Sequence, residues 1–402
     1  MRAMIARPLT PDFYDYAWQP IRSVELRGDF VELGWDDGTT LTAYCAWLRE
    51  NIVQAGFVDP ATREATLDPA DLTEGLTIAA ARKTDEGALT IVWADDVADS
   101  LFHPGWLYHV AASQHLPSAF LPDQSVWTAQ TLKEPPTRTY EDTLQEPAFG
   151  EWVEDLLRFG IAKLTQCPPE TDFIKTAIER IGPLRDTNFG LVWDVIAEVE
   201  LAGTDDANST ANTRLRLGPH TDLPTRETPP GFQVLHCLRN EAGGGASTYA
   251  DGYAVAAELE ATHPEYYELL TTRRWVFFNR GPGIDHRWSG PLIDRGAPGA
   301  PLTLRAFYPV RAFPDMPPAD VPCAYAALRC FSRLAAAERF QLRLRMQPGD
   351  LVAFDNRRIL HGRDAFDAGG VRHLRGVYID HDEVRSFARN AARRRASQHA
   401  RA

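Results

Sequence analysis

The sequence predicts a mainly β protein with flanking helices (α+β), in which a small β-rich domain precedes a larger sandwich or jelly roll. The length of 402 residues exceeds that of one typical hydrophobic core, so we expect two domains. Short apolar runs bounded by Gly, Pro and Asp recur through the second half of the chain, as is typical of many short strands. Amphipathic helical segments begin near residue 149. We therefore assign residues 1–115 to the small domain, 116–148 to a linker and 149–402 to the larger domain.

The small domain is predicted from hairpin signals. The stretch "SVELRGDFVELGWDDGTTLTAYCAWLRENI" alternates apolar and polar residues on both sides of Arg27-Gly28-Asp29, and a second turn follows at Asp36-Asp37-Gly38. The stretch "ALTIVWADDVADSLFHPGWLYHV" predicts a further strand and turn. The following residues lose this periodicity in "LPSAFLPDQ" and "KEPPTRTYED", which indicates the linker.

The larger domain opens with two predicted amphipathic helices, "GEWVEDLLRFGIAKLTQC" and "PETDFIKTAIERIG". Short strand-like runs follow: "FQVLHCL", "ASTYADGY", "RWVFFN", "LTLRAFYP", "DLVAFDNRRILHGR" and "VRHLRGVYID". Two helical segments interrupt them, "YAVAAELEATHPEYYELLTT" and "DVPCAYAALRCFSRLAAAERF". This order favours a sandwich or jelly roll with helices on its faces.

Composition excludes several classes of protein. Apolar residues make up 44% and charged residues 24%, as in ordinary soluble proteins, and the formal charge of −13 argues against nucleic acid or a membrane surface as a partner. The basic C-terminal stretch "RNAARRRASQHARA" is interpreted as a solvated helical end. "MRAMIARPLT" lacks the apolar stretch of a secretory signal. Scattered, odd-numbered cysteines predict free thiols in a reducing cytoplasm: Cys45, Cys167, Cys237, Cys323 and Cys330.

A candidate metal site begins with His220 and Asp222 in "LGPHTDLP". Residues two apart at a strand end project from the same face, so both side chains can reach one ion. His361, in "GDLVAFDNRRILHGRDAF", closes an apolar strand, and the turn after it should place its imidazole at a strand mouth. Two histidines and one carboxylate form the facial triad of non-haem Fe(II) sites, which leaves three coordination positions open. The alternative for His220 is an ordinary hydrogen-bonded histidine near a turn.

Arg372, in "GGVRHLRGVYID", lies eleven positions beyond His361. A turn and a returning strand would bring it back beside the metal, where a guanidinium can bind a carboxylate bidentately. The alternative for this arginine is a surface ion pair.

Several sequence motifs, spread over most of the chain, resemble the γ-butyrobetaine hydroxylase branch of the taurine dioxygenase superfamily. The motifs are "PHTDLP…PPGFQVLHCL", "GGGASTYADGY", "PGDLVAFDNRRILHGRDAF" and "RHLRGVYID", with "VELGWDDGT…WLREN" and "IVWADD…GWL" in the small domain. The resemblance implies a double-stranded β-helix (jelly roll), Fe(II) and O2 as cofactors, and 2-oxoglutarate as cosubstrate. It also implies iron ligation by His220, Asp222 and His361, with Arg372 on the distal carboxylate of 2-oxoglutarate. Ser247 falls in the small-hydroxyl region near the cosubstrate, although a turn-capping serine is equally compatible.

The small domain departs from that family. There, cysteines after the "WLR-N" segment and a later histidine hold a structural zinc. Here no cysteine occurs between Cys45 and Cys167, and His103 has no cysteine partners. Because a structural zinc needs four ligands, we predict that this domain folds without zinc and that Cys45 is a core residue.

The resemblance implies hydroxylation of an unactivated C–H bond in a small zwitterion, γ-butyrobetaine or a similar quaternary ammonium compound, as in carnitine biosynthesis. Relatives surround the trimethylammonium group with aromatic rings, because a ring face attracts a cation. Trp193 and Tyr378 match two of these rings, and Phe189 stands where tyrosine is common. Asn212 replaces a cage tyrosine, and Leu223 occupies a further substrate-facing position. Core packing is the alternative for Trp193 and Phe189.

Residues Tyr308, Arg305 and Arg311 in "TLRAFYPVRAF" also fall on the substrate side. Extra basic groups there would equally suit an aminophosphonate, a sulfonate or an amino acid, so these substrates remain an alternative. A second alternative is a catalytically silent jelly-roll binding protein, against which the intact ligand set counts. Relatives are often homodimers, so the resemblance implies a possible homodimer. The expected partner is a small-molecule substrate, with no nucleic acid and no membrane.

Overall fold

The computed structural model describes residues 8–399 apart from 55, 60, 198–212, 280–282, 298, 307–311 and 368–369, and it leaves aside the side chains of 197 and 396–399. The chain divides into two compact units, one extending to Phe120 and the other running from Leu121 to Arg395. Among the described residues, no helix combines the length and the apolar character that a membrane span requires. All five cysteines are free, as predicted.

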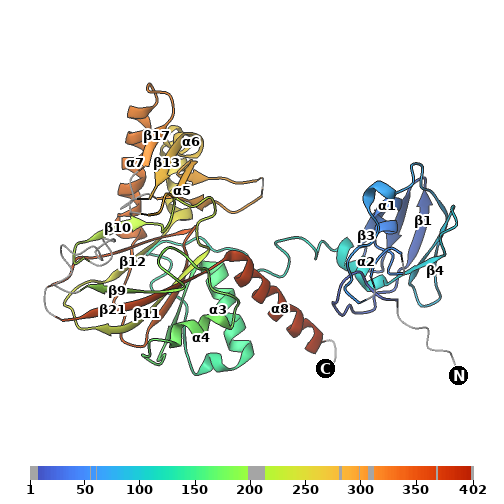
Figure 1. The fold of residues 1–402 in the computed structure, drawn as a ribbon, viewed down its shortest axis with the longest axis horizontal. Helices are drawn as coiled ribbons and strands as arrows, with labels where there is room; N and C mark the ends of the chain where they lie inside the picture. The colour runs from blue at the N-terminus through green and yellow to red at the C-terminus, as the bar shows by residue number, and fades with distance from the viewer. Residues whose placement is uncertain are drawn as a thin grey trace. The chain divides into compact units, whose positions relative to one another are not determined.

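The first unit contains two antiparallel three-stranded sheets around one apolar core (Figure 1). The hairpin turns include Gly28 and Gly38, whose φ angles of 57° and 85° are ones that glycine adopts without steric cost. Buried residues such as Val31, Leu33 and Ile91 fill the core. The elements are β1 (Ser23–Arg27), β2 (Phe30–Gly34), β3 (Thr40–Tyr44), α1 (Cys45–Glu50), η1 (Pro69–Asp71), β4 (Ile78–Lys83), β5 (Leu89–Trp93), β6 (Ser100–Phe102) and α2 (Pro104–Ala111).

The end of this unit is helical where we predicted only a strand and turn. Helix α2 starts at Pro104, whose fixed φ suits the first helical position. His103 caps it: its Nδ1 accepts the backbone N–H groups of Gly105 at 3.1 Å and Trp106 at 3.4 Å. The predicted core position of Cys45 is confirmed, because this thiol is fully buried and contacts the Leu76 carbonyl at 3.3 Å.

The second unit is the predicted sandwich with flanking helices. A six-stranded sheet has the order β7-β8-β19-β11-β21-β9, and a four-stranded sheet has the order β10-β20-β12-β18. All of these strand pairs are antiparallel except β7 with β8. The first sheet comprises β7 (Thr137–Thr139), β8 (Ile161–Thr165), β19 (Leu351–Asp355), β11 (Phe232–Asn240), β21 (Arg372–Ile379) and β9 (Val192–Ala197). The second comprises β10 (Leu217–His220), β20 (Ile359–Arg363), β12 (Ser247–Asp251) and β18 (Leu342–Leu344).

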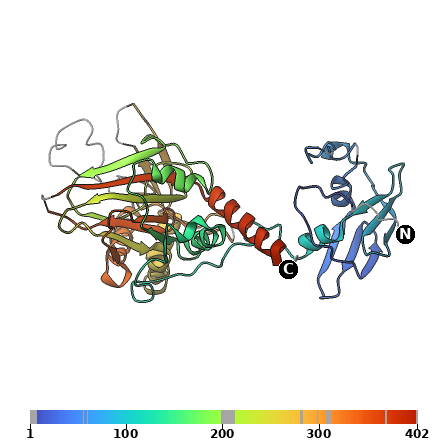
Figure 2. The same ribbon diagram turned by 90° about the horizontal axis from the view of Figure 1, so that it is seen from below.

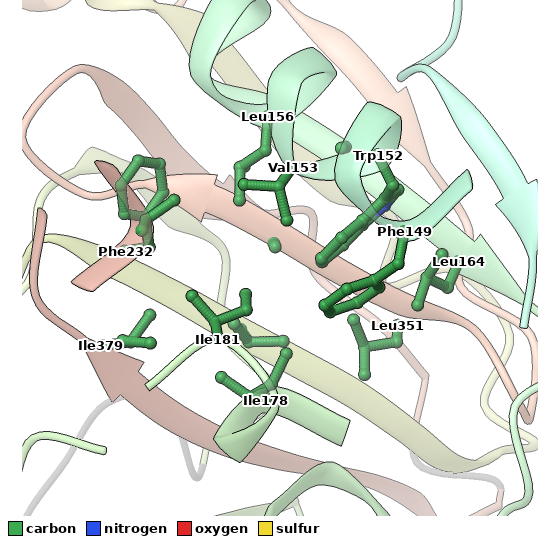
Figure 3. Close-up of a cluster of buried hydrophobic side chains, with 14 of the residues drawn as sticks. Phe149, Trp152, Val153, Leu156, Leu164, Ile178, Ile181, Phe232, Leu351 and Ile379 are labelled. Atoms are coloured by element: carbon green, nitrogen blue, oxygen red, sulfur yellow. The ribbon is translucent and has the colours of Figure 1, made fainter. Parts of the chain in front are cut away.

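Helices α3 (Glu146–Phe159), α4 (Phe173–Glu179) and α8 (His381–His399) pack on one face of the six-stranded sheet (Figures 1 and 2). Figure 3 shows the cluster of buried side chains between these helices and the sheet, which includes Trp152 of α3, Ile178 of α4 and Phe232 of β11. The predicted first helix was too long: it ends at Gly160, with φ 71°, and "IAKLT" is strand β8. Glycine at this position ends a helix because it adopts the left-handed conformation without penalty.

A second helical layer lies on the opposite side of the unit from α3 and α4 (Figure 1). The predicted single helix over "YAVAAELEATHPEYYELLTT" is two helices, α5 (Gly252–Thr262) and α6 (Pro264–Thr272), because Pro264 has no N–H to continue the ladder. The helix predicted over "DVPCAYAALRCFSRLAAAERF" is α7 (Val321–Ala335). The remaining elements are η2 (Asp142–Leu144), η5 (Glu338–Phe340), β13 (Arg274–Phe278), β14 (Arg287–Gly290), β15 (Ile293–Asp294), β16 (Thr303–Leu304) and β17 (Ala312–Asp315).

Candidate metal centre

Three side chains converge where the four-stranded sheet faces the interior of the sandwich. The Nε2 atoms of His220 and His361 lie 3.5 Å and 3.7 Å from Oδ1 of Asp222, and the two imidazole centroids are 4.2 Å apart. In the described part of the chain, this is the only group of three or more acidic, histidine or cysteine side chains whose ligand atoms all lie within 4.8 Å of one another. His220, Asp222 and His361 are thus close enough together to hold one ion between them.

Strand pairing explains the convergence. His220 ends β10 and is the direct partner of His361 in β20, so the two imidazoles are nearest neighbours across the sheet. His361 therefore lies in the middle of β20 and not at a strand mouth, which corrects our expectation. Gly362 allows this close approach, because a Cβ atom there would meet the Leu217 carbonyl oxygen at 2.6 Å.

Hydrogen bonds and burial orient the donor atoms. The His220 Nδ1–H donates to the Gly218 carbonyl at 2.9 Å, and the Nε2 atom faces Asp222. Burial, with the neighbouring His220, lowers the pKa of His361 to about 3, so this imidazole is neutral. Burial alone would raise the pKa of Asp222, but the imidazoles of His361 and His220 and the Tyr378 hydroxyl outweigh it and hold this pKa below its ordinary value. Two imidazoles and one carboxylate form a donor set that fits Fe(II).

Tyr378 supports the carboxylate ligand. Its hydroxyl donates to Oδ2 of Asp222 at 2.7 Å, so the other carboxylate oxygen is turned toward the histidines. The sequence had suggested only an aromatic wall at this position. Burial and the contact with Asp222 raise the pKa of Tyr378 well above its usual value, which keeps the hydroxyl a proton donor.

Arg372 and Ser247 meet across the sandwich. Arg372 begins β21 of the six-stranded sheet, Ser247 begins β12 of the other sheet, and Nη2 lies 3.5 Å from the serine Oγ. The arginine is only 2% exposed, which excludes the surface ion pair, and among the described residues it has no carboxylate partner. Burial lowers the pKa of Arg372, but the group remains a cation. A buried cation without a counter-ion is costly, so this position favours an anionic ligand.

The substrate-side residues are partly described. Trp193 of β9 is opposite Gly376, where a Cβ atom would come within 2.4 Å of the indole, so the ring lies directly over this glycine. Its centroid is 5.3 Å from that of Tyr378, with 34° between the ring planes. Phe189 is 40% exposed, which excludes core packing, and Leu223 follows Asp222 with a φ of 52°. The predicted residues Asn212, Tyr308 and Arg311 lie outside the described residues.

Two residues near the site have roles that the sequence did not reveal. Arg305, expected on the substrate side, is 2% exposed and donates to the carbonyls of Pro224, Arg226 and Glu227 at 2.7–3.1 Å. Its guanidinium is thus committed to the backbone and does not offer a site for an anionic headgroup. Asn356 was missed altogether; it is fully buried and bonds both the N–H and the carbonyl of Asp222. Asparagine between two strand-like runs has the pattern of an ordinary turn residue, so no sequence signal identified it.

The chain resembles known oxygenases along most of its length. Residues 127–378 match the family described as taurine catabolism dioxygenase TauD, TfdA family, and residues 23–108 match the γ-butyrobetaine hydroxylase-like N-terminal family. The chain is 36% identical over 371 residues to γ-butyrobetaine dioxygenase of Pseudomonas sp., covering 91% of this chain and 95% of that protein. It is 29% identical to the human γ-butyrobetaine dioxygenase, covering 89% and 93%. It is 28% identical to the mitochondrial trimethyllysine dioxygenase of Gallus gallus, covering 94% and 88%.

Proposed function

Because the chain belongs to the TauD, TfdA family, it is an Fe(II)- and 2-oxoglutarate-dependent dioxygenase, and we propose that it hydroxylates γ-butyrobetaine or a closely similar quaternary ammonium compound. We further propose His220, Asp222 and His361 as the iron ligands, and Arg372 with Ser247 as the site for the distal carboxylate of 2-oxoglutarate. One observation carries this assignment: a buried arginine without an acidic partner reaches the same interior as the three converging ligands.

Some residues of the site would bind the metal and the cosubstrate, and others orient the side chains that bind them. When bound, Fe(II) and 2-oxoglutarate supply the activation of O2 and the hydroxylation of a C–H bond. Asp222 and the two histidines would hold the ion, and the Tyr378 hydroxyl bonds Oδ2 of Asp222, which leaves Oδ1 toward the histidines. Arg372 and the Ser247 hydroxyl offer a charged and a neutral donor to a carboxylate. The surrounding side chains, including Tyr249 and Phe354, are buried and exclude water from this interior.

Three observations support a quaternary ammonium substrate. Trp193 and Tyr378 form an aromatic corner whose phenol hydroxyl bonds the proposed ligand Asp222, so a cation held there lies next to the reaction centre. Relatives matching nearly the full chain are named for γ-butyrobetaine and trimethyllysine. The commitment of Arg305 to three carbonyls removes one of the basic groups that would favour a phosphonate or sulfonate.

We also propose a cellular compartment and an oligomeric state for the protein. The free cysteines and the formal charge of −13 support a cytoplasmic enzyme of small molecules that binds neither nucleic acid nor membranes. A homodimer is proposed from the family resemblance alone. Measuring the molecular mass of the protein in solution tests this oligomeric state.

Succinate release with a substrate panel tests the function. We expect release coupled to hydroxylation with γ-butyrobetaine, weaker release with trimethyllysine, and background release with an aminophosphonate, a sulfonate and free amino acids. Coupled turnover of an aminophosphonate at a higher kcat/KM than γ-butyrobetaine would overturn the substrate assignment and leave the reaction class intact. No turnover with any compound, together with no binding of metal, would indicate the silent binding protein.

A further inference from the structure

The eight residues after Asp222, "LPTRETPP", form an irregular loop that we name the strap, residues 223–230. Three of them are prolines, which have no N–H group, so the strap cannot form a regular ladder with a neighbouring strand. Buried carbonyl groups nevertheless need hydrogen-bond donors. In this structure, side chains from distant parts of the chain supply them.

Arginines hold the middle of the strap. Arg305 donates to the carbonyls of Pro224, Arg226 and Glu227, as described above. Arg185 donates to the Thr228 carbonyl at 2.6 Å. Arg357 donates to the Pro229 carbonyl through both Nε and Nη2, at 3.0 Å and 2.7 Å. The strap thus has a fixed path without secondary structure of its own.

Asn356 holds the two ends of the same segment. Its Oδ1 accepts the backbone N–H of Asp222 at 2.7 Å, and its Nδ2 donates to the Asp222 carbonyl at 3.0 Å and to the Pro230 carbonyl at 3.3 Å. Asn356 lies in the turn between β19 and β20, and β20 carries His361. One side-chain amide therefore joins the backbone of the carboxylate ligand to the turn that leads into the strand of the second histidine.

We propose that Asn356 is a positioning residue that sets the orientation of Asp222 as a metal ligand, with Arg305 holding the turn that follows. Two hydrogen bonds to one residue's N–H and carbonyl fix the rotation of its backbone, and with it the direction of the side chain. Tyr378 then fixes the carboxylate itself. Groups that orient a metal ligand typically contribute 10- to 100-fold to metal affinity.

The inference rests on the proposed ligand set, and titration of the full-length protein with Mn(II), followed by the electron paramagnetic resonance signal of free Mn(II), tests both. Asn356→Ala removes all three bonds. Asn356→Asp keeps the size and the acceptor but loses the donor. We expect each variant to raise the Mn(II) dissociation constant roughly 10- to 100-fold, and Arg305→Lys to raise it about tenfold.

Arg185→Gln is the matched control, because Arg185 bonds the strap only at Thr228 and Pro229, whereas Arg305 bonds Pro224, two residues from Asp222. It should lower the free energy of unfolding yet leave the Mn(II) dissociation constant within about twofold of wild type. A merely structural role for Asn356 would give the same result as this control.

The outcomes separate the inference from the function. Wild-type protein that does not bind Mn(II) would contradict the ligand set itself. Wild-type binding with Asn356 variants that bind equally well would overturn only the positioning role. Should both Asn356 variants fail to fold, Arg305→Lys decides, and an unchanged Mn(II) affinity in that variant overturns the inference.

Discussion

Replacing Arg372 by Met should raise the stability of the ligand-free protein while it destroys cosubstrate binding. Arg372 is 2% exposed, its Nε has no partner among the described residues, and its contact with Ser247 is long at 3.5 Å. Exchanging a poorly compensated buried charge for an apolar side chain of similar length typically stabilises a protein by about 1–4 kcal/mol. We therefore expect the free energy of unfolding, measured by urea without ligand, to rise by roughly 1–3 kcal/mol.

The effect on 2-oxoglutarate should have the opposite sign. A carboxylate held by this guanidinium would lose charge-assisted hydrogen bonds worth about 1.5–3 kcal/mol each. Two such bonds correspond to a loss of roughly 10²- to 10⁴-fold in affinity. The assay is succinate release at graded 2-oxoglutarate concentrations, with saturating substrate and Fe(II).

Arg372→Lys is the control for charge alone, since Lys retains the cation but loses the planar pair of donors. It should show an intermediate KM for 2-oxoglutarate. An Arg372→Met protein that is destabilised by more than 2 kcal/mol and keeps the wild-type KM would refute the reasoning, because Arg372 would then be a structural residue.

Three further predictions concern other parts of the larger unit. Trp193→Ala should impair the coupling of succinate release to hydroxylation and leave 2-oxoglutarate binding within about threefold of wild type; global unfolding of this variant would instead identify Trp193 as a core residue. Asp251→Ala should lower the free energy of unfolding by about 3–5 kcal/mol, because Asp251 and Arg358 form an ion pair in which both side chains are 0% exposed; a loss below 1 kcal/mol in urea titrations would contradict this. Burial lowers the pKa of His236 to about 4, and neither ring nitrogen has a partner among the described residues. The folded protein therefore holds this imidazole neutral, while the unfolded chain protonates it below pH ~6.5. The free energy of unfolding is thus unaffected by His236 above pH ~6.5 and decreases as the pH falls toward 4. His236→Phe should therefore remove roughly 3 kcal/mol of acid destabilisation over that range, and parallel pH–stability curves for variant and wild type would argue against it.

The proposed ligands could be predicted in part. His220 and Asp222 are two residues apart where β10 ends, so the pattern is local. The place of His361 in the middle of β20 was not predicted, because the sequence indicated a strand mouth. The predicted helix lengths were less accurate where a single glycine or proline ends the helix. Gly160 and Pro264 each stop a helix that the apolar pattern alone would continue.

The supporting contacts could not be predicted, because they depend on chain segments that meet only in the folded protein. Asn356 reaches Asp222 across 134 positions, and Arg305 reaches Pro224 across 81. The sequence shows that an arginine is charged. It does not show whether a carboxylate, a ligand or a set of backbone carbonyls will accept the hydrogen bonds of its guanidinium. Arg305 and Arg372 illustrate two outcomes: both are buried, but Arg305 donates to three backbone carbonyls, whereas Arg372 has, among the described residues, one long hydrogen bond, with the Ser247 hydroxyl.

The most direct test of the site is the visible spectrum of the protein with Fe(II) and 2-oxoglutarate in the absence of oxygen. Chelation of the iron by the keto acid in a two-histidine, one-carboxylate site should produce a weak charge-transfer band in wild-type protein. His361→Ala should remove this band while the fold persists. A band of equal strength in His361→Ala, or none in the wild type, would contradict the ligand set on which the function rests.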